Sequence, residues 1–250
     1  MSMGLAGVAF LPVAVFVGFD SVLTTRGVSF VAASGLLHAV YYFTLTQAYR
    51  YADLSVVYPI ARGLGVTLVP FFALPLFGER PSMIGIAGVA LVVMGIVTGG
   101  IGGRKQGASL APGRGVWWAI VTGFLIAAYS LLDRAGVQWV HPVPYVSLMN
   151  LLAVFLLSPR ALADLGALRT ELKKSWRSVM VAACVNLTGY LLVLFAFRIA
   201  QTGYVVATRE LSIVMSTLIG GYLFKEANLK WRLIGSAIVV GGGFCIAFAG

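Results

Sequence analysis

The stretch AYRYA, residues 48–52, recurs 148 positions later as AFRIA, residues 196–200. Both copies begin with the pattern Ala-aromatic-Arg-x-Ala. With an offset of 147 the repeat continues through further matched positions: Phe77 and Glu79 with Phe224 and Glu226, and Gly88 and Gly95 with Gly235 and Gly242. An internal repeat in an apolar chain is typical of transporters that bind a substrate between two pseudo-symmetric halves.

The composition indicates a protein of the lipid bilayer. Of the 250 residues, 60% are hydrophobic and 10% are charged, whereas a soluble domain carries about a quarter charged residues. The net charge of +10 comes mainly from short loops between apolar segments, as in membrane proteins, so we expect no nucleic-acid partner. Cys184 and Cys245 lie in apolar segments and lack metal-site or disulfide spacing. We expect a multi-pass protein of a bacterial inner membrane.

Nine apolar segments are long enough to cross a bilayer about 30 Å thick as helices. They cover residues 1–19, 28–48, 54–77, 83–102, 115–133, 140–158, 178–197, 203–224 and 232–249. Between them, residues 159–177 alternate Arg, Lys and Glu, which predicts a partly helical strap on the surface. The fold class that follows is an all-α, polytopic membrane protein.

The repeat divides these segments unevenly. Residues 1–102 form a first repeat of four helices, 103–114 a linker loop, and 115–250 a second repeat of five helices. Segment 115–133 has no counterpart, so we expect two repeats of five helices with the first helix missing from this chain. A natural nine-helix protein is the alternative.

Repeats with an odd number of helices must be inverted relative to each other. Alternate loops carry twelve Lys and Arg on the side of residue 1 and four on the opposite side. By the positive-inside rule, this distribution predicts that residue 1 is cytoplasmic and Gly250 external.

Three charged residues lie within the apolar segments: Arg62, Arg209 and Glu210. Charges inside membrane helices are costly and indicate function by default. We predict that Arg62, in the setting Tyr58-Pro59-Ile-Ala-Arg62, binds an anionic substrate group together with Arg209. Glu210 is the candidate coupling residue, pairing with Arg62 across the repeats or titrating. For Glu210 the alternative is a purely structural ion pair. For Arg62 and Arg209 the alternative is that their side chains extend to the membrane surface.

His38 and Tyr42 lie four residues apart on one helical face, and their repeat images, Asn186 and Tyr190, share that spacing. We predict that these four side chains orient a substrate in a central pocket. Hydrogen bonding between helices is the alternative. Weaker candidates of the same kind are Tyr129, Asn150, Thr208 and Ser212.

Catalytic signatures such as GxSxG, HExxH or a phosphate loop do not occur in the sequence. We therefore expect no enzymatic activity, no metal and no cofactor. Glu79 and Glu226 are interpreted as markers of helix ends. Glycines such as Gly95 and Gly99 favour close packing of helices, within the chain or in a homodimer.

The residues from Leu37 to Gly95, with AYRYADLSVVYPIARG, then FGE and a glycine-spaced helix, resemble the EamA-like transporters of the drug/metabolite transporter superfamily. The second copy, with FKE, is similar. The resemblance covers nearly the whole chain. It implies ten helices in two inverted repeats, a central cavity that opens alternately to either side, and secondary transport of small metabolites, amino acids or drugs.

This chain departs from the family in two respects. The first helix, which lines the cavity in relatives, is missing. Family members also place both termini in the cytoplasm, whereas the distribution of Lys and Arg places both ends of a restored ten-helix chain outside.

The sequence thus predicts a secondary transporter for a small polar metabolite, such as an amino acid or an organic acid. Export is the favoured direction, and proton coupling through Glu210 is a hypothesis. The expected partners are the small-molecule substrate and the lipid bilayer. A multidrug exporter of the same fold and a non-transporting subunit of a membrane assembly are the alternatives, and a membrane enzyme is the least supported.

Overall fold

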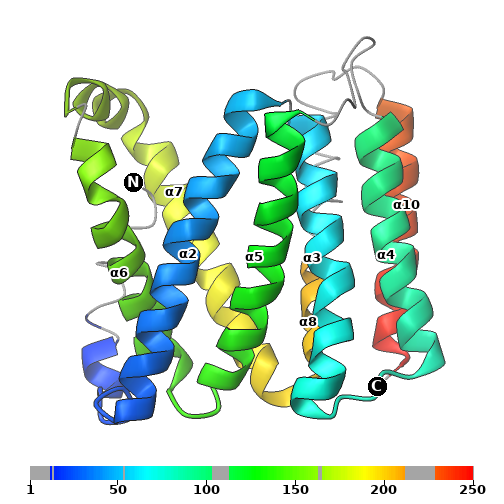
Figure 1. Ribbon diagram of the computed structural model, residues 1–250, viewed down its shortest axis with the longest axis horizontal. Helices are drawn as coiled ribbons and strands as arrows, with labels where there is room; N and C mark the ends of the chain where they lie inside the picture. The colour runs from blue at the N-terminus through cyan, green and yellow to red at the C-terminus, as the bar shows by residue number, and fades with distance from the viewer. Residues whose placement is uncertain are drawn as a thin grey trace. The chain divides into compact units, whose positions relative to one another are not determined.

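The computed structural model describes residues 12, 14–52, 54–102, 113–162, 165–211 and 229–249. Every regular element within these ranges is a helix (Figure 1), which confirms the predicted fold class. The helices are α2 (Thr25–Tyr51), α3 (Leu54–Phe77), α4 (Met83–Gly102), α5 (Arg114–Gly136), α6 (Pro142–Leu162), α7 (Leu165–Ile199), α8 (Thr202–Arg209) and α10 (Leu229–Ala247).

The helices follow the predicted membrane segments closely. Five stretches are long and apolar enough to cross a membrane: Thr25–Tyr51, Ile60–Phe77, Arg114–Gly136, Pro142–Pro159 and Lys174–Ile199. Helices α4 and α10 contribute the shorter apolar stretches Met83–Thr98 and Leu233–Ile246. The protein is therefore a polytopic membrane protein. Most of the first predicted segment, 1–19, lies outside the described residues.

The predicted helix 203–224 is interrupted early. Helix α8 ends at Arg209, and Glu210 and Leu211 form a turn in which the Glu210 N–H donates to the Ala207 carbonyl over 3.1 Å. Eight residues extend only about 12 Å, less than half of a bilayer core. Residues 212–228 lie outside the described part of the chain. The prediction of one unbroken helix is wrong at Glu210, because an apolar run shows where lipid is tolerated and not where the backbone turns.

The basic segment 159–177 is largely helical, as predicted. Helix α6 continues through Pro159 to Leu162, and α7 begins at Leu165. Within α7 the backbone leaves helical geometry at Ser175, where φ is −126° and ψ is 17°. The basic part of α7 and its apolar part, Lys174–Ile199, are therefore joined by a kink at Ser175.

Contacts divide the chain into two compact units, which differ from the two sequence repeats. The first unit contains residues 1–43 and 132–199, and the second contains residues 44–131 and 200–250. Helices that correspond in the repeat stay in the same unit: the first part of α2 with α7, α3 with α8, and α4 with α10. Each unit is thus assembled from both halves of the sequence.

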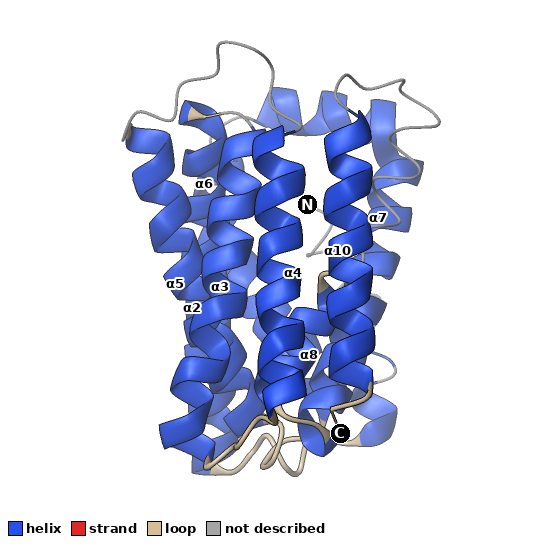
Figure 2. Ribbon diagram, turned by 90° about the vertical axis from the view of Figure 1, so that its right-hand side faces the viewer, coloured by secondary structure: helices blue, strands red, loops and turns tan. Residues whose placement is uncertain are grey.

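In the second unit, α4 and α10 pack side by side (Figures 1 and 2). A Cβ at Gly88 would lie 2.8 Å from the Gly242 carbonyl, and one at Gly95 would lie 2.6 Å from the Gly235 carbonyl. Only glycine permits this approach, because real Cβ atoms essentially never come so close to a backbone oxygen. The pairs run in opposite order along the two helices, so α4 and α10 are antiparallel.

Helices α3 and α8 also pack antiparallel. Gly203, at the start of α8, lies against Pro70 on α3, while Glu210, at its end, contacts Arg62 further back on α3. In both helix pairs, repeat-related helices therefore pack antiparallel. This is the contact pattern of inverted repeats related by a two-fold axis across the helices.

Candidate functional site

An ion pair joins α3 to the turn after α8 in the second unit. Arg62 Nη1 donates to Glu210 Oε1 over 2.9 Å, and the side chains are 22% and 2% exposed. This is the pairing that the sequence left open. The second carboxylate oxygen, Glu210 Oε2, is buried and has no hydrogen-bond partner in the part of the chain that the structure describes. A buried carboxylate with one satisfied oxygen is an unusual arrangement that requires an explanation.

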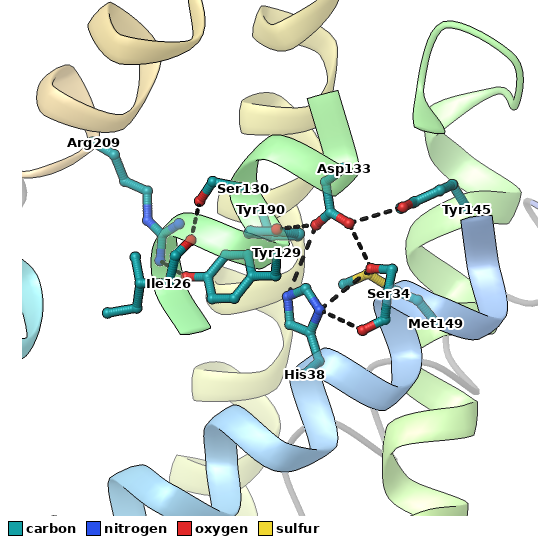
Figure 3. Close-up of polar contacts among 10 residues, drawn as sticks. All are labelled: Ser34, His38, Ile126, Tyr129, Ser130, Asp133, Tyr145, Met149, Tyr190 and Arg209. Atoms are coloured by element: carbon teal, nitrogen blue, oxygen red, sulfur yellow. Dashed lines mark hydrogen bonds and ion pairs between the residues drawn. The ribbon is translucent and has the colours of Figure 1, made fainter. Parts of the chain in front are cut away.

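Three further candidates lie around this pair. Tyr58, one helical turn before Arg62, places its ring 5.6 Å from the guanidinium carbon, within range of a cation–π contact. Glu210, Arg62 and Arg209 all act electrostatically on the Tyr58 hydroxyl. Arg209 Nη2 donates to the hydroxyl of buried Tyr129 over 3.4 Å (Figure 3). The second unit thus gathers two guanidinium groups, one carboxylate and two phenols.

A second polar network lies in the first unit and is centred on Asp133 of α5, which is fully buried. Its Oδ1 accepts from Ser34 Oγ over 2.5 Å and from Tyr145 Oη over 2.8 Å. The Tyr190 hydroxyl donates to Oδ2. Figure 3 shows the three hydroxyls, from α2, α6 and α7, converging on the carboxylate. Asp133 therefore links three helices to α5.

His38 belongs to the same network and is 3% exposed. Its Nε2 lies 4.0 Å from Asp133 Oδ2, and its Nδ1 lies 2.9 Å from the Ser34 carbonyl oxygen. The imidazole also meets the Tyr190 ring edge-to-face, with centroids 5.5 Å apart. His38 and Tyr190, both predicted as site residues, are thus neighbours.

The remaining candidates are placed differently. Tyr42 packs its ring against Tyr41, 4.7 Å between centroids, and lies 6.5 Å from the His38 ring. Asn186, the repeat image of His38, is exposed on α7. Asn150 is buried and Thr208 is exposed, whereas Ser212 lies outside the described residues.

Sequence reasoning missed Asp133 and its donors Tyr145 and Ser34. Asp133 is the last residue of the predicted segment 115–133 and is absent from the three charges predicted to lie in apolar segments, so that set is incomplete. Helix α5 continues to Gly136 and buries Asp133. One signal was present: Tyr129 and Asp133 are spaced four apart, as two polar residues on one helical face are.

Glu79 is another correction, since it does more than mark a helix end. Its carboxylate accepts from the Thr202 N–H over 2.8 Å and from Thr202 Oγ1 over 2.6 Å. A carboxylate at a helix N-terminus satisfies an otherwise unpaired N–H group and complements the helix dipole. Glu79 thereby fixes the start of α8 against the end of α3.

The sequence profile of the EamA-like transporter family matches residues 113–248, more than half of the chain. The chain belongs to the EamA-like transporter family. This family is part of the drug/metabolite transporter superfamily, so the motif resemblance is confirmed and the protein is a multi-pass membrane transporter. The EamA-like chain also matches a protein of known crystal structure with a TM-score of 0.75. That match has 18% identity and covers 99% of this chain and 86% of the other, so it shows the fold alone.

Proposed function

We propose that this EamA-like transporter moves a small polar metabolite with an acidic group across the bacterial inner membrane by alternating access. The observation that carries the proposal is the buried ion pair between Arg62 and Glu210. An arginine within membrane helices is costly and is generally retained for binding or for coupling. Its planar guanidinium matches the geometry of a carboxylate, which is the chemistry we assign to the substrate.

In this proposal the Glu210 carboxylate occupies the position on Arg62 that the substrate carboxylate takes when it binds. A substrate carboxylate that binds Arg62 displaces the Glu210 carboxylate, which is almost fully buried. An unpaired buried carboxylate is strongly disfavoured in its charged form, so the displaced Glu210 takes up a proton. Among the described residues Glu210 Oε2 has no hydrogen-bond partner, which supports this, because the carboxylate is then only partly stabilised even when paired.

Proton and substrate binding are then linked. Protonation of Glu210 frees Arg62 for the acid, and binding of the acid raises the affinity of Glu210 for the proton, since linkage is reciprocal. When one acid anion and one proton bind together, the net charge of the site that contains Arg62 and Glu210 does not change. Export of an accumulated acid down its own gradient is the direction we predict.

The neighbouring groups fit a polar ligand. Tyr58 and Tyr129 place phenol groups beside Arg62 and Arg209. Hydroxyl and guanidinium donors are suited to the oxygen atoms of an amino acid or an organic acid.

The helix arrangement supports alternating access. Inverted repeats can exchange conformations, which opens a binding site alternately to the two sides of the membrane. Helix α8 ends directly before Glu210, and helix ends within the membrane are features from which such transporters build their sites.

The test is a binding screen on the purified protein in detergent micelles, read by thermal unfolding. L-amino acids, dicarboxylic acids and monocarboxylic acids are compared with their amides and with cationic drugs. We expect stabilisation by acids and not by the matching amides. Proteoliposomes loaded with a radiolabelled hit then give the direction of transport. Stabilisation by cationic drugs alone would favour the multidrug exporter, and a protein that binds none of these compounds would contradict the proposal.

A further inference from the structure

The Asp133 network of the first unit contains a histidine whose tautomer can be assigned. The Ser34 carbonyl oxygen only accepts hydrogen bonds, so His38 Nδ1, at 2.9 Å, must be the donor. The Ser34 hydroxyl donates to Asp133 Oδ1 over 2.5 Å. In neutral His38 the proton therefore resides on Nδ1, and Nε2 carries the lone pair.

Nε2 is also the ring nitrogen that forms the ion-pair contact with Asp133. Nε2 is 4.0 Å from Asp133 Oδ2, and both residues are buried in membrane helices, on α2 and α5. With neutral His38, the network holds the negative charge of Asp133 in a poorly polarisable environment. A proton on Nε2 converts this charge into a neutral pair, which favours uptake of the proton.

We propose that His38 and Asp133 form a proton-binding site of this transporter, separate from the pair of Arg62 and Glu210. The proton comes from water and adds to the lone pair of His38 Nε2, and no covalent bond breaks. The imidazolium is then held by the Ser34 carbonyl at Nδ1 and by the Asp133 carboxylate at Nε2. Proton binding therefore tightens the connection between α2 and α5.

Other titratable groups face the pair from each helix of the unit. Tyr145 on α6 and Tyr190 on α7 donate their hydroxyls to Asp133. Tyr41 and Tyr42, on α2 itself, place their rings 6.5 Å from the His38 ring. The next residue along α5 is the cation Arg134. The Tyr145 and Tyr190 hydroxyls already donate to Asp133, so the imidazole of His38 is the group to which the proton adds.

The composition of the chain allows a direct measurement, because His38 and His141 are its only histidines. In the His141→Gln protein, ¹⁵N-histidine NMR in lipid bilayers reports His38 alone. We expect the Nδ1–H tautomer at high pH and protonation of Nε2 as the pH falls. In Asp133→Asn the proton affinity of His38 should fall about tenfold or more, the effect of losing one nearby opposite charge.

A second variant changes the affinity in the opposite direction. Tyr145→Phe removes one donor to the Asp133 carboxylate, so the carboxylate should hold the imidazolium more tightly and proton affinity should rise. Ser147→Ala is the matched control, since Ser147 is buried on the same helix but donates only to the Val143 carbonyl over 2.9 Å. It should leave the titration unchanged.

His38 that stays neutral down to pH 5, or that carries its proton on Nε2 at high pH, would overturn the proposal. So would a titration that neither Asp133→Asn nor Tyr145→Phe changes. If Asp133→Asn does not fold, Tyr145→Phe decides alone. No substrate is needed, so this outcome is independent of whether Arg62 binds an acid.

Discussion

Arg62 and Glu210 lie 148 positions apart, the spacing at which residues 48–52 recur as 196–200, and their side chains form an ion pair of 2.9 Å. The pair therefore connects two repeat-related helices, α3 and α8, since Glu210 directly follows α8. Antiparallel packing of such helices is the arrangement expected of inverted repeats.

Removing Arg62 should abolish binding of acids. In Arg62→Ala the Glu210 carboxylate stays buried without its partner, so a loss of about 3–5 kcal/mol of stability is expected. The double variant Arg62→Ala/Glu210→Gln removes both charges and should recover much of that loss while still failing to bind. Thermal unfolding with and without the acid measures both effects. Arg114→Ala, which removes an arginine near Tyr51, is the control. Full-affinity binding by the double variant would contradict the assignment.

Glu210→Gln should separate substrate binding from pH. The glutamine cannot release a proton, so acid affinity should become independent of pH in the range where the wild-type affinity rises on acidification. Equilibrium binding of the labelled acid between pH 5 and 8 measures this. An unchanged pH dependence of affinity would show that Glu210 is a structural partner only.

The close glycine contacts between α4 and α10 predict that a larger residue at these positions destabilises the protein. Gly88→Ala places a Cβ against the Gly242 carbonyl, so the helices must separate, at a cost of about 1–3 kcal/mol. Gly241→Ala is the matched control, because a Cβ there meets nothing within 4 Å among the described residues. Its expected effect is a gain of up to about 1 kcal/mol from helix propensity. Equal thermal stability of the two variants would argue against the close contact.

Glu79→Ala should loosen the start of α8. The change leaves the Thr202 N–H and hydroxyl without their acceptor, and the expected loss is about 1 kcal/mol, as for an N-cap residue. Glu79→Gln keeps one acceptor oxygen and should lose less. Hydrogen exchange at the amides of residues 202–205 detects the difference, and identical protection in both variants would contradict the capping role.

His141, in the loop before α6, has a pKa below its usual 6.5 because burial and the nearby Arg198 charge disfavour the imidazolium. Neutral His141 therefore favours the folded state, and this contribution is present above pH 6.5 and lost as the pH falls below it. Arg198→Gln should raise the pKa of His141 toward 6.5. In His38→Gln protein, ¹⁵N NMR follows His141 alone, and a pKa at or above 6.5 would contradict the expectation.

The sequence by itself determined the membrane class, the helical segments and the repeat. These properties follow from the length of apolar runs and from matched positions, which are local along the chain. It also indicated that the repeats are inverted, because each has an odd number of helices, and it offered Arg62 as a partner of Glu210 with titration of Glu210 as the other possibility.

Only the tertiary structure decided which polar residues share an environment. His38 and Asn186 are sequence images, yet His38 is 3% exposed and Asn186 lies exposed on α7. Helical spacing places a residue on a face but does not say which neighbour covers that face. Asp133 stood at the edge of an apolar segment, and its burial depends on Ser34, Tyr145 and Tyr190, which lie far apart in sequence. The turn at Glu210 could not be predicted from the sequence either. Hydropathy shows whether a segment can lie in lipid, but it does not show where the backbone turns.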